Sequence, residues 1–357
     1  MKRSFLSLAV LTLLAVAALV MFTPTKGPSG KTDEGALLLP EVAVEIKGIN
    51  RVEIVSAGAV TVATLIKTGE SWQIEQMGGY RANWTSLNTL LSELAQARVV
   101  ETKTDKPEYY ARLGVEDVSE EGAASVLVKL NAGDNTTGIL IGHQAQGRSG
   151  QYVRLQNSAV SALVDRKIEV STERLDWVDT NIVDIYSSEV AEVELIHPTG
   201  ERVFVMRISA DQTDFDLAGI PQDKEIKNSW AVNSFGSVFS MLDMETVQSE
   251  DMVDWDDAVK MRMLLFSGVE ILADMVESGD AYMLRLHASH PAAKVLESEN
   301  DVSIEQQELE KQAADDVAKT VETINQKSLG WAYGISQHKF EAMVKKPEDL
   351  LKPRDAP

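Results

Sequence analysis

The chain has 357 residues, 44% hydrophobic and 25% charged, no cysteine, and a formal net charge of −21 at pH 7. This length and apolar content exclude disorder of the whole chain, and the missing cysteines exclude disulfides, thiolate catalysis and cysteine-based zinc sites. The negative charge disfavours nucleic acid and anionic lipid headgroups as ligands of the body, whereas a basic partner, a divalent cation or simple solubility would explain it.

The N-terminal segment predicts a membrane anchor. Lys2 and Arg3 precede an apolar run over 5–22. Eighteen helical residues span about 27 Å, close to the hydrocarbon thickness of a bilayer. The small-x-small form of 15–17 would also suit a cleavable signal peptide, but apolar residues continue beyond it. We therefore expect a single-pass protein of the bacterial inner membrane with residues 1–4 in the cytoplasm and the body in the periplasm.

A flexible stalk over 23–39, rich in Pro, Gly and small polar residues, leads into the folded body. Pro40 predicts the start of a short helix. Alternating apolar residues then predict a series of strands, and leucines at helical spacing after Asn83 predict one helix among them. The strands expected before residue 175 are Val52–Val55, Val60–Leu65, Ser71–Ile74, Ser125–Leu130, Gly138–Gly142, Tyr152–Leu155 and Ala162–Val164.

The order of these elements recurs in the second half of the chain. Val193–Ile196 resembles Val52–Val55, and Ser229–Val232 matches Ser71–Ile74 as a further strand. Asn233 is expected to precede a second helix, followed by strands over Met261–Phe266 and Tyr282–Leu286. We predict an α+β fold with two tandem repeated units of antiparallel sheet packed with a helix, over 40–175 and 176–298.

The C-terminal segment, 299–357, is expected to contain an amphipathic helix, a strand over Trp331–Ile335 and a short helix over Phe340–Leu351. Ser303 and Gln306 form a capping box for the amphipathic helix. One apolar stripe follows, formed by Val302, Leu309, Ala313, Val317, Val321 and Ile324. Packing on the second sheet and docking of a partner both remain open for this helix.

No pattern in the sequence predicts a catalytic residue, a cofactor or a metal ligand. Gly30-Lys31-Thr32 lacks the earlier glycine and the preceding strand of a phosphate-binding loop, since Thr25 stands at the first position. Gly147–Gly150 has the wrong spacing for a nucleophile elbow. His287 and His290 would lie on opposite faces of a strand, so a metal site there would require a turn.

Two further features carry alternatives. The acidic cluster over 243–257 offers oxygen ligands to calcium, but it lacks the glycine and the final glutamate of an EF-hand loop, so a solvated loop is the simpler interpretation. Trp72 and Trp230 stand at matched places in the two repeats. They could stack on sugars. Alternatively, as their matched places favour, each could pack between its sheet and its helix.

Several segments resemble the bacterial domain of unknown function 4340 over essentially the whole chain beyond the anchor. The most specific are GGYRAN at 78–83 and RLGVED at 112–117. The others are LLLP at 37–40, RVEIVSAG at 51–58, SWQIEQ at 71–76, LLSELAQARVVETKT at 90–104, LIG at 140–142, QYVRL at 151–155, WVDTNIVDI at 177–185 and GWAYGI at 330–335. Asn83 replaces an acidic residue usual at that place in the family.

The resemblance implies a protein anchored by one helix and commonly encoded beside transporter components of the gliding-motility type. It supplies no catalytic motif. We therefore expect a non-catalytic interaction protein, an auxiliary component of an ABC-transporter-like membrane complex, with protein partners and no nucleic acid. The alternatives are an envelope hydrolase or saccharide-binding protein, and a divalent-cation-binding module.

Overall fold

The computed structural model describes residues 34–147, 149–290 and 304–354, so the predicted anchor and the Gly30-Lys31-Thr32 segment lie outside the described residues. Within the described ranges, no helix has the length and apolar character needed to cross a membrane. The chain divides into two compact units. Of the described residues, the first contains those up to Thr64 and those within Thr85–Thr172, and the second contains Leu65–Trp84 and those from Glu173 onward.

A nine-stranded antiparallel sheet has the order β4-β3-β2-β1-β6-β7-β8-β9-β5. Its strands are β1 (Ile49–Ser56), β2 (Val60–Thr68), β3 (Ser71–Ile74), β4 (Tyr80–Arg81), β5 (Val99–Thr102), β6 (Val126–Ala132), β7 (Asn135–Gln144), β8 (Gln151–Leu155) and β9 (Ser161–Val164). In β1, Val52 and Ile54 are fully buried and Glu53 between them is not, as the alternating pattern predicts.

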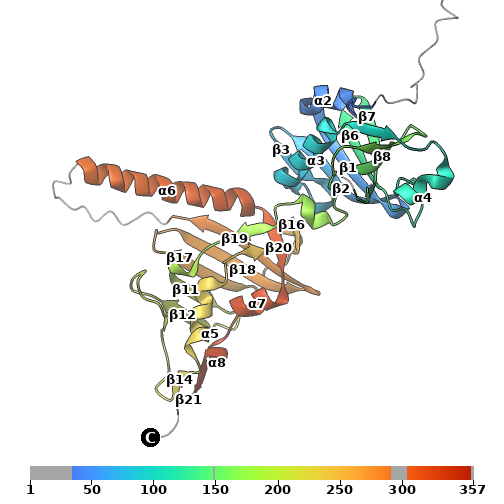
Figure 1. The fold of residues 1–357 in the computed structure, drawn as a ribbon. Helices are drawn as coiled ribbons and strands as arrows, with labels where there is room; N and C mark the ends of the chain where they lie inside the picture. The colour runs from blue at the N-terminus through green and yellow to red at the C-terminus, as the bar shows by residue number, and fades with distance from the viewer. Residues whose placement is uncertain (1–33, 148, 291–303, 355–357) are drawn as a thin grey trace, which may run out of the picture. The chain divides into compact units, whose positions relative to one another are not determined.

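Helix α3 (Trp84–Gln96) lies across one face of this sheet (Figure 1). Its leucines at helical spacing, Leu87, Leu90, Leu91 and Leu94, are all buried. Asn83 directly precedes the helix, as predicted from the sequence. The short helix α2 (Pro40–Glu45) begins at the predicted proline, and α4 (Tyr110–Leu113) follows β5.

A second antiparallel sheet has eight strands in the order β13-β12-β11-β17-β18-β19-β20-β16. Its strands are β11 (Val190–Ile196), β12 (Arg202–Met206), β13 (Asp216–Leu217), β16 (Thr246–Ser249), β17 (Val259–Leu265), β18 (Glu270–Ser278), β19 (Ala281–Ser289) and β20 (Trp331–Ile335). Two strand pairs stand apart from it: β10 (Asn181–Val183) with β15 (Leu242–Asp243), and β14 (Lys224–Ile226) with β21 (Leu351–Pro353).

The two sheets share a strand order. In the first it reads β3-β2-β1-β6-β7-β8-β9-β5, and the second has β13-β12-β11-β17-β18-β19-β20-β16 in the same positions. Helix α5 (Ser229–Asn233) stands before β16 as α3 stands before β5. The described chain is therefore α+β with antiparallel sheets, as predicted.

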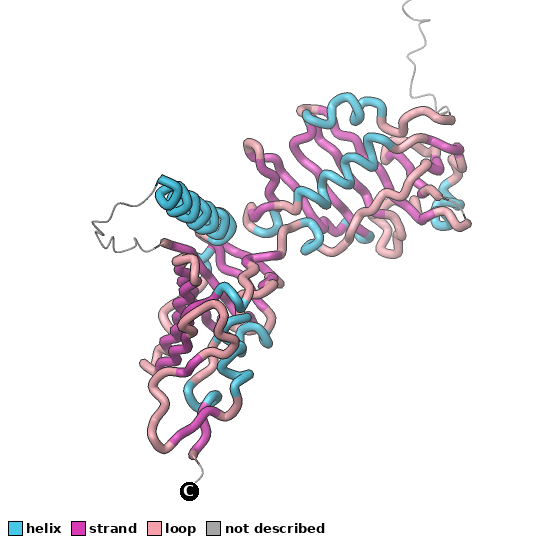
Figure 2. The backbone as a smooth tube through the Cα atoms, turned by 60° about the vertical axis from the view of Figure 1, so that its left-hand side comes forward, coloured by secondary structure: helices cyan, strands magenta, loops and turns pink. Residues whose placement is uncertain are grey.

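The connection before β9 in the first sheet differs strongly from its counterpart before β20 in the second. Residues 156–160 join β8 to β9, whereas helix α6 (Ile304–Ser328) lies in the connection from β19 to β20. Among the described side chains of α6, the buried ones lie in its C-terminal half: Val317, Ile324 and Ser328 are buried, and α6 lies against β19 and β10 (Figures 1 and 2). Helices α7 (Gln337–Met343) and α8 (Pro347–Leu350) follow β20.

The predicted strand over Ser229–Val232 is wrong, because these residues form the first turn of α5. The cap of this helix is Asn228 rather than Asn233: its side chain accepts a hydrogen bond from the Ala231 amide at 2.9 Å, which satisfies an amide left free at a helix start. Trp72 and Trp230 are therefore not equivalent. Trp72 is buried in β3, whereas Trp230 is 69% exposed.

Candidate functional site

Three segments that carry the resemblance meet in the second unit, namely 78–83, 177–181 and 331–335. Gly78 and Gly79 have φ angles of 66° and 85°, a conformation that favours glycine and that turns the chain into β4. Beyond β4, the Asn83 amide donates to the Trp177 carbonyl at 2.8 Å. The fold thus joins stretches that are far apart in the sequence.

Aromatic rings form the centre of this junction. Tyr80 is fully buried and meets Trp331 and Tyr333 edge to face, with ring centroids 5.1 Å and 6.1 Å apart. The Tyr333 hydroxyl donates to the Lys327 carbonyl at 2.7 Å, and burial raises the pKa of Tyr333 well above its ordinary value. The hydroxyl therefore stays protonated at physiological pH and acts as a donor, not as a base.

A charged group borders the rings. The Asp179 carboxylate lies 3.1 Å from the Lys327 ammonium and 3.8 Å from the Arg81 guanidinium. Within the described residues, the Tyr80 hydroxyl and the buried Nε and Nη2 of Arg81 have no hydrogen-bond partner of ordinary geometry. This arrangement can hold three segments together, but it contains no nucleophile placed next to a base.

Three carboxyl groups of the described chain have a clearly shifted pKa, and none of the three has the shift that a general acid needs. Where a carboxyl pKa departs clearly from its ordinary value, at Glu53, Asp117 and Asp165, it is lowered. Arg51 and Lys129 hold down the pKa of Glu53, and hydrogen bonds from Ser119 hold down that of Asp117. A general acid for glycoside hydrolysis needs the opposite shift.

The acidic cluster predicted over 243–257 is distributed along the chain. Asp243 lies in β15, whereas Glu250 and Asp251 belong to a 3-10 turn (Glu250–Met252), and Asp254 accepts a hydrogen bond from the Asp256 amide at 3.0 Å. In the part of the chain that the structure describes, no three His, Asp or Glu side chains converge as metal ligands. His287 and His290 are both exposed.

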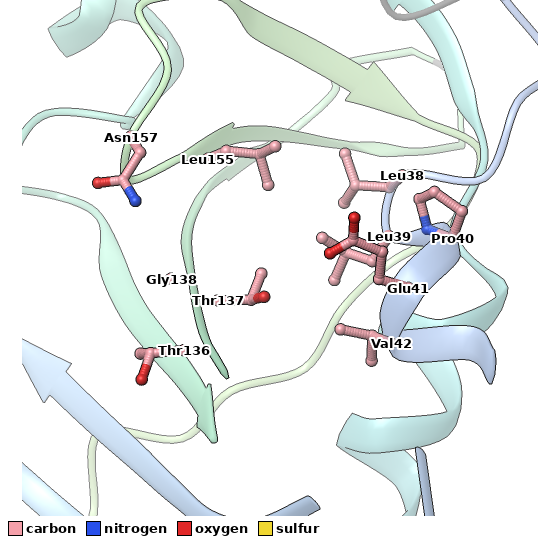
Figure 3. Close-up of a pocket in the computed structure, with 10 residues that line it drawn as sticks. All are labelled: Leu38, Leu39, Pro40, Glu41, Val42, Thr136, Thr137, Gly138, Leu155 and Asn157. Carbon is pink, nitrogen blue, oxygen red and sulfur yellow. The ribbon is translucent and has the colours of Figure 1, made fainter. Parts of the chain in front are cut away.

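A cavity of about 280 Å³ lies in the first unit between α2 and the β7 and β8 strands (Figure 3). Glu41 is the one charged residue in its lining. Thr136, Thr137 and Asn157 face it from the opposite side, and Leu38 and Leu155 add apolar surface (Figure 3). Its lining fits neutral or cationic groups better than anions.

A second cavity, of about 350 Å³, lies in the second unit between α6 and the segment 181–185, and we call it the α6 groove. Ile182, Val183 and Ile185 give it an apolar lining on one side. Lys319 and Lys327 line it from α6. The sequence predicts an apolar stripe on α6, but no pattern in it indicates the two lysines or the strand that faces them.

The comparisons with known proteins identify one relationship. A family model described as "Domain of unknown function (DUF4340)" matches residues 72–257, more than half of the chain. No curated protein and no solved structure matches the chain. The matched region contains two of the three segments of the junction, 78–83 and 177–181, whereas the third, 331–335, and all of α6 lie beyond it.

Proposed function

Because this chain belongs to the family described as domain of unknown function (DUF4340), we propose that it is a non-catalytic, membrane-anchored interaction protein. The apolar run over 5–22 supports an anchor in the bacterial inner membrane, with the acidic body in the periplasm. The family resemblance supports an auxiliary role in an ABC-transporter-like complex of the gliding-motility type.

The observation that carries this proposal is helix α6. It lies between β19 and β20, and the corresponding connection of the first sheet, between β8 and β9, consists of residues 156–160. Every described side chain from Glu308 to Asp316 is exposed. Exposed side chains gain a helix little stability from tertiary packing, so contact with another protein is a use that fits the described part of this first half.

A photo-crosslinking experiment tests the proposal. A photoreactive amino acid at Ala314, exposed on α6, would be introduced into the full-length, membrane-embedded protein. Asp134, at the exposed tip of the β6–β7 hairpin, serves as the matched control. We expect a membrane protein to be captured from Ala314 and not from Asp134. Capture of no membrane protein from Ala314 would contradict the proposal.

The shared strand order also supports an internal duplication, with α6 as an insertion into the second copy. The segments that precede the first strand of each sheet support the same inference, because each runs beside the residues that follow the helix of its copy. Residues 35–38 run beside Arg98 and Val99 directly after α3. In the second copy β10 runs beside β15, which follows α5. We infer that the two copies have since diverged, and that the insertion of α6 is one of the differences between them.

Saccharide binding is a second candidate, favoured by one observation. Trp230 is 69% exposed, and the Lys345 ammonium lies 5.6 Å from its ring centroid, which would suit an anionic sugar. Titration with an anionic oligosaccharide should then quench tryptophan fluorescence, and Trp230→Ala should abolish the effect. Trp84→Ala, which removes another exposed tryptophan, is the control. Unchanged fluorescence in the unsubstituted protein would dismiss this candidate.

A further inference from the structure

A cavity of about 360 Å³ in the second unit lies beside the turn that joins β11 to β12. Pro198 restricts the backbone of this turn, and Gly200, with a φ angle of 86°, takes the conformation that favours glycine. The Gly200 amide donates to the His197 carbonyl at 2.8 Å, and the His197 amide donates to the Glu201 carbonyl at 2.9 Å. The backbone at His197 is therefore fixed on both sides.

The His197 ring brings an acceptor without a donor to this cavity. His197 lines the cavity, although the residue is only 5% exposed. Its Nε2 lies 3.2 Å from the Lys345 carbonyl. A carbonyl oxygen only accepts, so Nε2 carries the hydrogen and Nδ1 of the neutral ring is an acceptor. Within the described residues, Nδ1 has no hydrogen-bond partner. A ligand N–H group would satisfy it.

Two carboxylates line the same cavity. Asp257 lies just before β17 and Glu277 near the end of β18, its antiparallel neighbour, so both stand at the same end of this strand pair. Neither carboxylate forms an ion pair or a side-chain hydrogen bond within the described residues. Lys346, the one lysine in the described lining, lies 3.9 Å from the Glu201 carboxylate instead. The described lining thus holds two negative charges without a partner, which favours a cation.

Apolar side chains form another part of the wall. Met275 of β18 and Phe340 of α7 are buried, and Val344 directly follows α7. The Phe340 ring lies against Tyr282, with the two ring centroids 4.9 Å apart. The volume of the cavity is in the range of small-molecule sites, which combine an apolar wall with a few polar groups. An apolar body together with a positive charge would match this lining.

An organic ammonium group fits the polar part of the lining better than a metal ion or an anion. Among the described residues, no three His, Asp or Glu side chains converge as metal ligands. A neutral imidazole Nδ1 and a carboxylate both accept hydrogen bonds, so they match the N–H donors of an ammonium group. The same carboxylates would repel an anion.

We propose that this cavity binds a small organic ammonium ligand with an apolar body. The ammonium group donates to Nδ1 of His197 and pairs with Asp257 and Glu277, and the apolar body packs against Met275 and Phe340. This inference goes beyond the proposed interaction function, because it assigns a small-molecule site that does not depend on a protein partner.

NMR titration of the full chain in phosphatidylcholine nanodiscs tests the proposal. Labelled methionine methyl groups report binding, and Met275→Leu identifies the signal of Met275. The probe is phenethylammonium, and phenethyl alcohol has the same apolar body without the charge. We expect the ammonium to shift the Met275 signal and to bind at least about tenfold more tightly than the alcohol. Asp257→Asn with Glu277→Gln should remove this preference. Asp256→Asn with Asp280→Asn, at exposed positions outside the lining, is the matched control and should preserve it.

The hydrogen bond to His197 is tested separately. Trimethylated phenethylammonium keeps the charge but has no N–H donor, so it should bind the unsubstituted protein about tenfold more weakly than the primary ammonium. His197→Phe should weaken binding of the primary ammonium by a similar factor and leave binding of the trimethylated probe nearly unchanged. Melting temperature reports whether this variant folds, and the comparison of the two probes on the unsubstituted protein does not depend on it.

Several results would overturn the proposal: equal binding of phenethylammonium and phenethyl alcohol, binding of neither, an unchanged Met275 signal, or equal effects of the two pairs of carboxylate substitutions. Equal binding of the primary and trimethylated probes would reject the role of His197 as an acceptor. Tighter binding of N-acetyl-lysine amide than of phenethylammonium would assign the cavity to a lysine side chain of a partner protein, and it would reject the small-molecule site.

Discussion

At the scale of single residues, Glu53 links stability to pH. Its carboxylate contacts Arg51 at 2.8 Å on the same strand and Lys129 at 3.2 Å on β6, and the Arg51 hydrogen bond is the main cause of its lowered pKa. Because the folded pKa is lower than the ordinary 4.5, the stabilisation is complete above that value and is lost as the pH falls through the folded pKa.

Glu53→Gln should therefore reduce the free energy of unfolding by about 1 kcal/mol or less at pH 7, and the difference from the unsubstituted protein should shrink toward pH 3. Urea unfolding at several pH values measures this. Glu121→Gln, at an exposed position, is the control for the loss of one carboxylate. A difference that stays constant from pH 7 to pH 3 would show that Glu53 acts through something other than its charge.

We expect the two tyrosines of the junction, Tyr80 and Tyr333, to respond differently to loss of their hydroxyl groups. The Tyr333 hydroxyl donates to the Lys327 carbonyl, whereas the Tyr80 hydroxyl has no partner of ordinary geometry among the described residues. Tyr333→Phe should cost about 1 kcal/mol, because it removes a partly buried hydrogen bond to the Lys327 carbonyl. Tyr80→Phe should be neutral or stabilising, because it removes a buried polar group. Thermal melting of both variants measures the two effects on stability. Equal losses of stability would contradict the different hydrogen bonding of the two hydroxyl groups.

At the scale of elements, Asn228 determines where α5 begins. Its side chain accepts from the Ala231 amide, so Asn228→Ala should lower the free energy of unfolding by about 1 kcal/mol. Asn228→Ser retains an acceptor and should restore most of that loss. Denaturant unfolding measures both variants. If alanine and serine were equally destabilising, the side chain would contribute by packing rather than by capping.

Helix α5 and the elements around it show which parts of the fold can be predicted from the sequence and which cannot. Strands with strong alternation, such as β1, and the leucine-spaced helix α3 were predictable because local periodicity reports burial directly. The strand β18 was missed, since its inward residues include Ala273 and Met275, which have weak strand propensity. The start of α5 was misjudged because a short Ser-Trp-Ala-Val stretch fits a strand as well as a helix start.

The candidate site was less predictable than the fold, for a different reason. The walls of the α6 groove come from 181–185 and from 319–327, and no local pattern records that these segments lie together. The junction was partly visible, since its segments 78–83, 177–181 and 331–335 carry the family resemblance. Their meeting, however, depends on strand order, which periodicity does not determine.

At the scale of the whole molecule, the shared strand order suggests how α6 can be replaced. The connection at the same place in the first sheet can take the position of the segment that contains α6. Residues 156–160, which join β8 to β9, could be grafted in place of 291–329 between β19 and β20. The graft would remove two hydrogen bonds of 2.8 Å, one from the Ala288 amide to the Asn325 side-chain oxygen and one from the Asn325 side-chain nitrogen to the Ala288 carbonyl, and the burial of Val317 and Ile324.

We expect the grafted protein to fold, because the first sheet closes with this connection, but to melt several degrees lower. Losing two apolar contacts of about 1.5–3 kcal/mol each should destabilise the second unit substantially. Deletion of 304–314 alone removes a part of α6 whose described side chains are exposed, so it should leave the melting temperature unchanged. Circular dichroism melts of both proteins measure this. If the protein with the shortened helix melted at as low a temperature as the grafted protein, the deleted part of α6 would support the fold. Helix α6 would then be a structural element rather than an interaction surface.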